Sequence, residues 1–396
     1  MTALRILLVI DYKLAYLGGA QTAFVQQARA LAGADHEVTV AAPDALAQSQ
    51  LAAAGIRGWD VPVSFVVPGA DLPMVANTAR TRDILNRRMR DWQTDLVMVH
   101  SEFGLAAAAI EVAAQLGIPS LHTVHTFFWR APGLADVAAP LVAAAHTLAT
   151  GIAAPRVRLA PGRLDSALRG MTLAVARTAD LVVSPSHHQA SALRAAGLLN
   201  VVVISNTAER EPGRPLVVSA PGPLRLVWAA RFAPEKRLDV ALGAMAIVEN
   251  ILGAGAVLLD VAGGRARRTA PASVVFHGRV SSAGVERMMD EAHAAVVTSV
   301  GFDNQPMIAI EAFRAGRPVI VCDPTLATEF GAAAIGAGDV TAEALARTIV
   351  RLALDRDLLR GPAAAARRYA LGATAEQHVV AIERAHGSLA QFAPLC

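Results

Sequence analysis

The sequence predicts an α/β protein built from two Rossmann-like doubly wound lobes. Three observations lead to this prediction. The chain has 396 residues, 54% of them are apolar and only 5% aromatic, and short apolar runs alternate with amphipathic segments throughout. Val- and Leu-rich parallel strands covered by Ala-rich helices have this composition. A chain of this length is long for one domain and comfortable for two.

The first half of the chain alternates strand and helix patterns. Its apolar runs predict strands at Arg5–Ile10, Glu37–Ala42, Leu96–His100, Ser120–His125, Leu181–Val183 and Val201–Ile204. The amphipathic segments between them predict helices that include Gln21–Ala32, Gly104–Leu116 and Asp165–Thr178. This rhythm is typical of a doubly wound parallel sheet, so we expect an N-terminal domain over residues 1–205.

A segment rich in Pro, Glu, Arg, Ser and Gly, residues 206–223, interrupts the rhythm and predicts a linker. New strands are then expected at Leu224–Ala229, Val257–Ala262, Val274–His277, Ala294–Val297 and Pro318–Val321. Helices are expected at Leu238–Asn250, Ala283–Ala292, Met307–Ala315 and Ala342–Leu354. We therefore predict a second domain over residues 224–373, and a C-terminal helix at about 374–396 that packs back on the first lobe. Ligands of such sheets bind beyond the carboxyl ends of the strands, so the two lobes are expected to face each other across a cleft.

Charge and cysteine content restrict the function. The formal net charge is +3, which suits a small anionic ligand or an anionic membrane surface and is too weak to indicate nucleic acid. The two cysteines, Cys322 and Cys396, form no metal-binding spacing and no disulfide framework, which favours a cytoplasmic location. The apolar N-terminal run is read as a strand, not a signal peptide, and no run approaches the ~20 residues that span a bilayer.

The most informative stretch is residues 299–319, where two acids stand eight positions apart. Asp303 lies in the loop after a predicted strand, and Glu311 lies inside the next predicted helix. The start of such a helix can bind an anion, and a carboxylate can bind two vicinal hydroxyls of a ribose or a sugar. The alternative is that Asp303 only caps the helix and Glu311 lies on a solvated face.

Two cations follow the first strand of the second lobe. Arg231 lies just past that strand, and Lys236 lies in the loop before the next helix. Cations at the carboxyl end of a strand, near a helix N-terminus, suit a diphosphate. A surface loop with solvated cations is an equally good interpretation of this motif taken alone.

In the first lobe, glycines and histidines mark the ends of predicted strands. Gly18 and Gly19 let the backbone approach a ligand at a helix start, but they do not form a Gly-x-Gly-x-x-Gly fingerprint, so a nicotinamide dinucleotide is poorly supported. His100 and His125 both end predicted strands, at the edge where ligands bind. A single histidine there is more often structural than catalytic; two at equivalent positions favour a function.

Two further patterns have plain alternatives. Asp355 and Asp357 form an Asp-x-Asp pair, but arginines surround it at a helix end, so we predict no required metal and no other cofactor. The arginines of residues 80–90, with Ile84, Leu85 and Met89 among them, form a basic amphipathic pattern that suits peripheral contact with an anionic membrane. A solvated surface helix is the favoured alternative.

Taken together, these stretches resemble the family-four retaining glycosyltransferases of GT-B fold (glycosyl transferases group 1), over nearly the whole chain. The matching segments, in the family's order, are Gly18-Gly19, His36–Val38, Asp95–His100, Thr123–His125, Ala179–Ser186, Val203–Asn206, Arg231 with Lys236, Val274–Val280, and Asp303 to Glu311. The resemblance implies a metal-independent enzyme. It would transfer a sugar from a nucleotide-diphosphate sugar to an acceptor hydroxyl, with retention, in glycan, glycolipid or cell-envelope biosynthesis.

The resemblance also implies roles for individual residues. Arg231 and Lys236 would neutralise the leaving diphosphate, His125 would lie by the transferred sugar, Asp303 would hold its hydroxyls, and Glu311 would hold the ribose. Further donor contacts would come from Gly18, Gly19, Gly278, Val280, Gln305, Met307 and Ile308. Two departures affect the site: Asp303 stands where the family usually has Glu, and Pro306 removes one backbone N–H.

Other functions stay open on the same scaffold. One is a sugar-nucleotide epimerase or a phosphorylase, although a phosphorylase needs a cofactor lysine and Lys occurs only at positions 13 and 236. Another is a catalytically silent binding subunit of a glycan-assembly complex. The sequence identifies neither the donor base and sugar nor the acceptor, which is a carbohydrate, a lipid or a small molecule.

Overall fold

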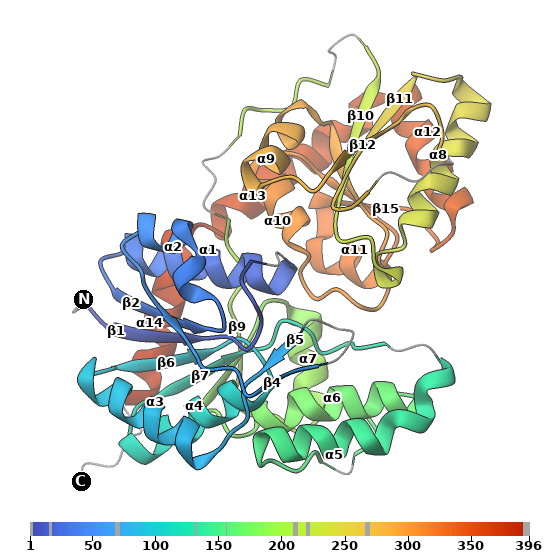
Figure 1. Cartoon of the computed structure of the whole chain (residues 1–396). Coiled ribbons are helices and arrows are strands. Elements are labelled where there is room, and N and C mark those ends of the chain that lie inside the picture. The colour runs from blue at the N-terminus through green and yellow to red at the C-terminus, as the bar shows by residue number, and fades with distance from the viewer. Residues whose placement is uncertain are drawn as a thin grey trace. The chain divides into compact units, whose positions relative to one another are not determined.

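The chain folds into two compact units, each with its own parallel sheet (Figure 1). The computed structural model describes residues 3–15, 18–67, 72–130, 133–155, 157–208, 213–218, 222–265 and 270–390. Unit 1 comprises Met1–Thr207 and Ala375–Cys396, and unit 2 comprises Ala208–Thr374. Helices cover both faces of each sheet, so the predicted α/β fold of two doubly wound lobes is confirmed.

Unit 1 has a seven-stranded parallel sheet in the order β3-β2-β1-β6-β7-β8-β9. Its strands are β1 (Arg5–Val9), β2 (Glu37–Ala42), β3 (Arg57–Asp60), β6 (Leu96–Val99), β7 (Ser120–Thr123), β8 (Leu181–Ser184) and β9 (Val201–Val203). A separate antiparallel hairpin consists of β4 (Phe65–Val67) and β5 (Leu72–Met74). The helices are α1 (Gly19–Gly33), α2 (Ser49–Ala53), α3 (Ala79–Asp91), α4 (Gly104–Leu116), α5 (Ala139–Thr150), α6 (Arg163–Ala176), α7 (His187–Ala195) and α14 (Ala375–Ala390), and single 3-10 turns lie at Ala45–Ala47 and Gly133–Ala138.

Strand β1 shows why this sheet needs helices on both faces. Successive side chains of a strand point to opposite faces. Ile6 and Leu8 pack in the core beneath α1 and α14, whereas Leu7 and Val9 pack in the core beneath α3 and α4. All four side chains are at most 2% exposed, as expected for a continuous apolar run in a parallel sheet.

The C-terminal helix α14 belongs to unit 1 and packs along α1. Its residues Val379, Ile382 and Ala385 are buried in the core. His378 is fixed between two partners, since its Nδ1 lies 2.8 Å from the carbonyl oxygen of Ser205 and its Nε2 lies 2.7 Å from the Nε2 of Gln27. A neutral ring with its proton on Nδ1 satisfies both contacts, and burial lowers the pKa of His378 to about 4.

Unit 2 has a six-stranded parallel sheet in the order β12-β11-β10-β13-β14-β15. Its strands are β10 (Leu224–Ala229), β11 (Val257–Ala262), β12 (Val274–Gly278), β13 (Ala294–Val297), β14 (Val319–Val321) and β15 (Ala334–Gly336). The helices are α8 (Leu238–Leu252), α9 (Ser282–Glu291), α10 (Met307–Arg314), α11 (Pro324–Phe330), α12 (Ala342–Leu354) and α13 (Arg360–Gly372), with 3-10 turns at Pro234–Lys236, Gly331–Ala333 and Arg356–Leu359. The β10 side chains Leu226 and Trp228 pack against α8 and α12, and Val227 packs toward α9, α10 and α13.

The described residues of the predicted linker, residues 206–223, belong largely to unit 2. Residues 209–212 and 219–221 are outside the described part of the chain. In the described part, the backbone N–H of Gly213 donates to the carbonyl of Arg314 at 2.7 Å, and Val218 is buried in the unit 2 core. Unit 2 therefore begins at Ala208, well before strand β10.

Helix α3 carries the basic amphipathic pattern of residues 80–90, which suits contact with an anionic membrane. Its apolar residues Leu85 and Met89 are fully buried in the core of unit 1, so its apolar face is already covered. Arg88 stacks on the rings of Trp59 and Trp92. These contacts favour the alternative of a surface helix whose apolar face belongs to the core.

Three smaller features complete the fold. Asp355 and Asp357 are exposed at the end of α12, where Asp357 pairs with Arg360 at 2.8 Å. Cys322 is buried, and Cys396 lies outside the described residues. Within the described ranges, no helix is both long and apolar enough to cross a bilayer.

Candidate functional site

The strand order of unit 2 creates a crevice at one point of its sheet. Strand β10 has β11 on one side and β13 on the other, so the connections that follow β10 and β13 leave the sheet in opposite directions. Open α/β sheets bind ligands at such a switch point, beyond the carboxyl ends of the strands. Arg231 and Lys236 follow β10, and Ser299 and Asp303 follow β13. The fold thus brings the two predicted motifs to the same place.

Lys236 and Asp303 form an ion pair at this switch point. The Nζ of Lys236 lies 2.5 Å from Oδ1 of Asp303, with side-chain exposures of 17% and 12%. The hydroxyl of Ser299 donates to the other carboxylate oxygen at 2.5 Å. The ammonium also lies 5.4 Å from the ring centre of Phe302. Both oxygens of Asp303 are therefore engaged, and a bound sugar would have to share or replace these partners.

A chain of hydrogen bonds fixes the backbone that carries Lys236. The indole Nε1 of Trp228 donates to the hydroxyl of Thr298 at 2.9 Å, and that hydroxyl donates to the carbonyl of Lys236 at 2.6 Å. The next residue, Arg237, has a left-handed φ of 51° and donates to the carbonyl of Val340 at 2.6 Å. The ammonium is held in place before any ligand binds, which is the condition for electrostatic stabilisation of a transition state.

Arg231 lies at the same strand end but has a different partner. Its Nη2 is 3.2 Å from Oε1 of Glu235, and 43% of its side chain is exposed. An exposed ion pair contributes little to stability, so its arginine can exchange that partner for an anionic ligand at small cost.

Two glycines that sequence reasoning missed lie beside this loop. Gly263 has a φ of +125°, and a Cβ on it would meet the carbonyl oxygen of Ala230 at 1.9 Å. A Cβ on Gly264 would meet the ring of Phe232 at 2.6 Å. Only glycine lets the ends of β10 and β11 approach so closely. The signal in the sequence is a glycine pair directly after the apolar run 257–262.

The predicted base-side segment, Gly278 and Val280, follows β12. Gly278 has a φ of +70°, and its carbonyl accepts a hydrogen bond from the N–H of Gly263 at 2.7 Å. Val280 is half-buried and packs near Gly284 at the start of α9. This segment therefore borders the glycine pair, two strands away from Lys236.

Helix α10 holds the remaining predicted donor contacts. Met307 and Ile308 form its first turn, where N–H groups have no partner within the helix, and both side chains are buried. Glu311 lies one turn further and is half-buried. The side chain of Gln305 donates to the hydroxyl of Tyr369 on α13 at 2.9 Å, so this amide supports the packing of α10.

In unit 1, the switch point lies between β1 and β6, and two histidines stand next to it. The Nδ1 of His100, after β6, lies 2.8 Å from the Nε2 of His125, after β7, and the rings stack with centres 5.1 Å apart. Burial lowers the pKa of His125 to about 4 and that of His100 well below its usual value. The pair is therefore neutral at pH 7 and can offer hydrogen bonds without a charge.

Two buried acids that sequence reasoning missed occupy the same edge. Asp11 accepts from the hydroxyl of Ser101 at 2.7 Å and from the N–H of Leu105 at 2.9 Å, and burial raises its pKa to about 6. Glu102 accepts from the hydroxyl of Tyr12 at 3.1 Å, and burial raises its pKa to about 8. Glu102 is therefore mainly protonated at pH 7. The sequence signal that could have found them is an acidic residue shortly after each of the apolar strands β1 and β6.

The predicted glycine loop of unit 1 lies at the start of helix α1. Gly18 precedes α1 with a φ of −113°, which any residue can adopt, and a Cβ on Gly19 would meet nothing within 4 Å. Packing among the described residues therefore does not require glycine at position 19. The neighbouring residues 16–17 lie outside the described part of the chain.

The opposite edge of the unit 1 sheet also has a depression, of about 610 Å³. It is lined by the beginnings of strands, including Arg5, Glu37 and Arg57. Ligands of parallel α/β sheets bind beyond the carboxyl ends of the strands, so we assign this depression no role.

Comparison with known proteins identifies the family. Residues 17–212 match Glycosyltransferase Family 4, and residues 223–355 match Glycosyl transferases group 1. The chain belongs to the family-four glycosyltransferases. The predicted family is thereby confirmed. No curated protein matches this glycosyltransferase in sequence.

Solved structures of similar fold cover nearly the whole glycosyltransferase. HepE from Anabaena, in complex with UDP and glucose, has a TM-score of 0.66 at 14% identity and covers 97% of this chain and 100% of its own. Sucrose-phosphate synthase from Thermosynechococcus elongatus has a TM-score of 0.66 at 16% identity, over 98% and 99%. A TarM mutant from S. aureus, in complex with UDP among other ligands, has a TM-score of 0.67 at 9% identity, over 96% and 99%. At these identities the likeness shows the fold, which is GT-B.

Proposed function

We propose that this glycosyltransferase transfers a sugar from a nucleotide-diphosphate sugar to an acceptor hydroxyl with retention of anomeric configuration, in glycan, glycolipid or cell-envelope biosynthesis. The observation that carries the proposal is the half-buried ion pair of Lys236 and Asp303 at the switch point of unit 2, with Arg231 at the same strand end. The binding of UDP and glucose by HepE, a protein of the same fold, supports a nucleotide-sugar donor.

The chemistry of transfer explains why two cations stand there. The bond between the anomeric carbon and the phosphate oxygen breaks, its electron pair stays on the nucleoside diphosphate, and positive charge grows on the sugar. The acceptor oxygen bonds to the anomeric carbon on the same face and passes its proton to a leaving phosphate oxygen. Lys236 and Arg231 stabilise the departing negative charge. Because Lys236 is already positioned, little reorganisation is required in the transition state.

The other donor contacts follow from the same edge of the sheet. Glu311 on α10 binds the ribose hydroxyls, the first-turn N–H groups of Met307 and Ile308 bind the sugar or the diphosphate, and residues 278–280 border the base. The two cations take the place that a metal ion has in other transferases, so we propose that no metal is required. Unchanged turnover in EDTA would agree with this part of the proposal, and loss of turnover restored by a divalent ion would contradict it.

The edge of unit 1 suits the acceptor and the transferred sugar. His125 is neutral at pH 7, so its ring can exchange hydrogen bonds with a sugar hydroxyl and adds no positive charge near a carbon that itself becomes positive. His100 fixes the orientation of that ring through their shared hydrogen bond.

The test is a transfer assay on Lys236→Ala with a panel of nucleotide sugars. The wild type should release nucleoside diphosphate only when an acceptor is present, and NMR of the product should show the anomeric configuration of the donor. Loss of one pre-positioned donor commonly lowers turnover by about 100- to 1,000-fold, and we expect that loss at saturating donor. Arg360→Ala, which removes an exposed cation of the same unit, is the control. Unchanged turnover in Lys236→Ala would contradict the assigned role, and inversion would contradict retention.

A further inference from the structure

Helix α5 of unit 1 exposes an apolar face that no described residue of its own unit covers. Its sequence, residues 139–150, contains no acid, lysine or arginine. Leu141 and Leu148 are 73% and 87% exposed, and exposed Ala144 and Ala145 lie between them. Positions three, four and seven apart share one side of a helix, so these side chains form one stripe. Val137, just before the helix, is 88% exposed and extends the stripe. Contiguous apolar surface of this kind marks an interaction site.

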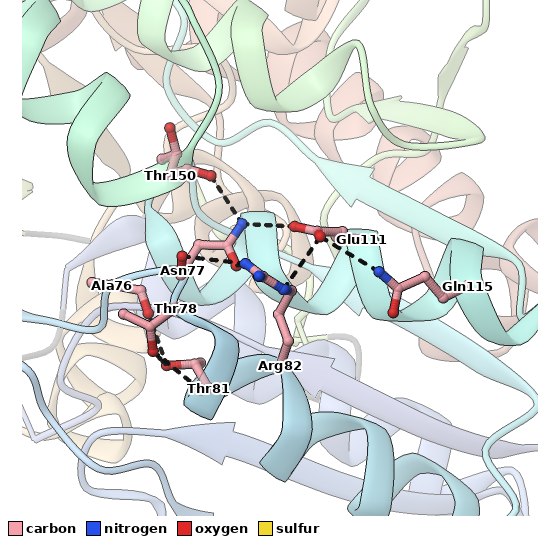
Figure 2. A network of polar contacts seen from close by, with 8 residues as sticks. All are labelled: Ala76, Asn77, Thr78, Thr81, Arg82, Glu111, Gln115 and Thr150. Carbon is pink, nitrogen blue, oxygen red and sulfur yellow. Dashed lines mark hydrogen bonds and ion pairs between the residues drawn. The ribbon is translucent and has the colours of Figure 1, made fainter.

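The opposite face of α5 is held firmly by the protein. The buried ring of His146 donates from Nε2 to the carbonyl of Glu102 at 2.8 Å. At the C-terminal end of the helix, the side-chain amide of Asn77 donates to the carbonyl of Thr150 at 2.9 Å and to Glu111 at 3.0 Å (Figure 2). Arg82 closes this network by pairing with Glu111 at 3.3 Å. The apolar stripe is thus presented by an anchored helix.

A shallow groove and one more exposed apolar residue lie near the stripe. Helix α6 packs along one side of α5, as Figure 1 shows. A groove of about 460 Å³ lies on α5, lined by Ala143, Ala144, Thr147, Ala153 and Ala154. Val157, in the segment that joins the two helices, is 50% exposed.

The charges around the stripe are mainly positive. Between residues 130 and 169 the chain has five arginines and two acids, Asp136 and Asp165. Arg130, Arg158 and Arg163 are exposed. The pKa of the Asp136 carboxyl group is lowered first by hydrogen bonds from the backbone N–H groups of Leu164 and Arg163, and then by the nearby charges of Arg163 and Arg158. Asp136 is also occupied, because it accepts from the N–H of Leu164 at 2.9 Å. An apolar stripe with an arginine rim is complementary to an anionic bilayer, which offers hydrocarbon beneath negative headgroups.

We propose that the stripe of α5, with its rim of Arg130, Arg158 and Arg163, docks the protein on the surface of an anionic lipid bilayer. The stripe consists of Val137, Leu141, Ala144, Ala145 and Leu148. This surface is distinct from that of helix α3, whose apolar residues Leu85 and Met89 are buried in the core. A helix is about 10 Å across, and the inner face of α5 contacts Glu102 at the strand-end edge of unit 1. Docking would therefore hold that edge near the headgroups. If the proposed transferase function holds, the acceptor is then a hydroxyl on a membrane-anchored molecule.

The test is flotation of the full-length protein with vesicles of phosphatidylcholine alone or mixed with phosphatidylglycerol. We expect co-flotation with the mixed vesicles at low salt, at least a several-fold weaker association at high salt, and little association with phosphatidylcholine alone. The double variant L141Q/L148Q should lose co-flotation, and R158Q/R163Q should lose most of it at low salt. The thermal unfolding of these variants should stay unchanged, since all four side chains are exposed.

The matched control is L199Q/L354Q, which makes the same change at leucines that are 93% and 74% exposed elsewhere. It should float like the wild type. The proposal fails if the wild type does not float with anionic vesicles at low salt, or if L141Q/L148Q floats as well as the control. It also fails if L141Q/L148Q converts a dimer to a monomer in light scattering without changing flotation, because the stripe would then belong to a second copy. Binding of nucleotide sugar without vesicles is measured in parallel; its loss would concern the proposed transferase function, not the docking surface.

Discussion

Lys236 and Asp303 are most informative as a pair. A lysine ammonium that is largely buried needs a compensating charge, and Asp303 supplies it at 2.5 Å. Asp303 is in turn fixed by Ser299 and by the short loop that follows β13. The carboxylate that lies beside the ammonium of Lys236 therefore also sets its position. The structure adds this positioning task to the sugar-binding role that the family resemblance implies for Asp303.

At the residue scale, sequence could predict where the candidate side chains of unit 2 lie in the sheet but not which residues they contact. Asp303, Lys236 and Arg231 each follow an apolar run, so their place at strand ends could be predicted. The contact between Lys236 and Asp303 spans 67 positions in the chain and depends on β10 and β13 being neighbours in the sheet. The engagement of Gln305 with Tyr369 depends on how α13 packs, which no local pattern encodes.

Glu102 gives a prediction about pH. Its pKa is raised by burial from 4.5 to about 8, so between these values the folded protein keeps a proton that the unfolded chain releases. Stability from this group is fully present below pH 4.5 and is lost as pH rises toward 8, by at most about 1.4 kcal/mol per pH unit. Glu102→Gln cannot ionise and still accepts from Tyr12. We expect the free energy of unfolding of the wild type, relative to Glu102→Gln, to fall by at least about 1 kcal/mol between pH 5 and pH 8.

This difference is measured by urea denaturation followed by tryptophan fluorescence, to which Trp59, Trp92 and Trp129 of unit 1 contribute. The buried histidines titrate in both proteins, so their contributions cancel in the comparison. The charge of Asp11 is part of the measured difference, because it helps to raise the pKa of Glu102. Parallel pH profiles for the two proteins would show that Glu102 is ionised in the folded state at neutral pH.

At the scale of elements, long apolar runs could be predicted and irregular elements could not. The bounds expected for Glu37–Ala42, Leu224–Ala229 and Gly104–Leu116 agree with the structure, because each combines strong periodicity with a polar or glycine flank. Strand β3 (Arg57–Asp60) was missed, since this edge strand is half-exposed and has no apolar run. Helix α5 was missed because its apolar residues surround the helix and leave no amphipathic pattern. For the same reason, its solvent-exposed face is apolar.

The glycine pair after β11 leads to a prediction at this scale. Gly263→Ala places a Cβ 1.9 Å from the carbonyl oxygen of Ala230 at a φ of +125°, so the ends of β10 and β11 must separate. Gly255→Ala is the matched control, since Gly255 has a φ of +84° but open space around its Cβ. We expect about 1 kcal/mol of destabilisation in the control and roughly 2–3 kcal/mol more in Gly263→Ala. Thermal unfolding measures both, and equal losses would show that the loops move apart without strain.

At the scale of the molecule, each unit keeps its candidate residues at the switch point of its own sheet. Unit 2 brings Lys236 and Asp303 together with Arg231 at the proposed donor site, whereas unit 1 holds a neutral histidine pair and a protonated acid. Composition and alternating patterns could predict two such lobes and a returning C-terminal helix. They could not predict that α14 is fixed by His378 between Gln27 and Ser205, because those partners lie far from it in the chain.

Isothermal titration calorimetry of nucleoside diphosphates and nucleotide sugars, on the full-length protein without vesicles, tests the assignment of the donor site most directly. The wild type should bind at least one nucleoside diphosphate, and the double variant R231A/K236A should bind it at least about tenfold more weakly, which corresponds to 1.4 kcal/mol. The exposed control R360A should bind like the wild type. Equal affinity of R231A/K236A and the wild type, or no binding of any nucleoside diphosphate by the wild type, would contradict a donor site at the end of β10.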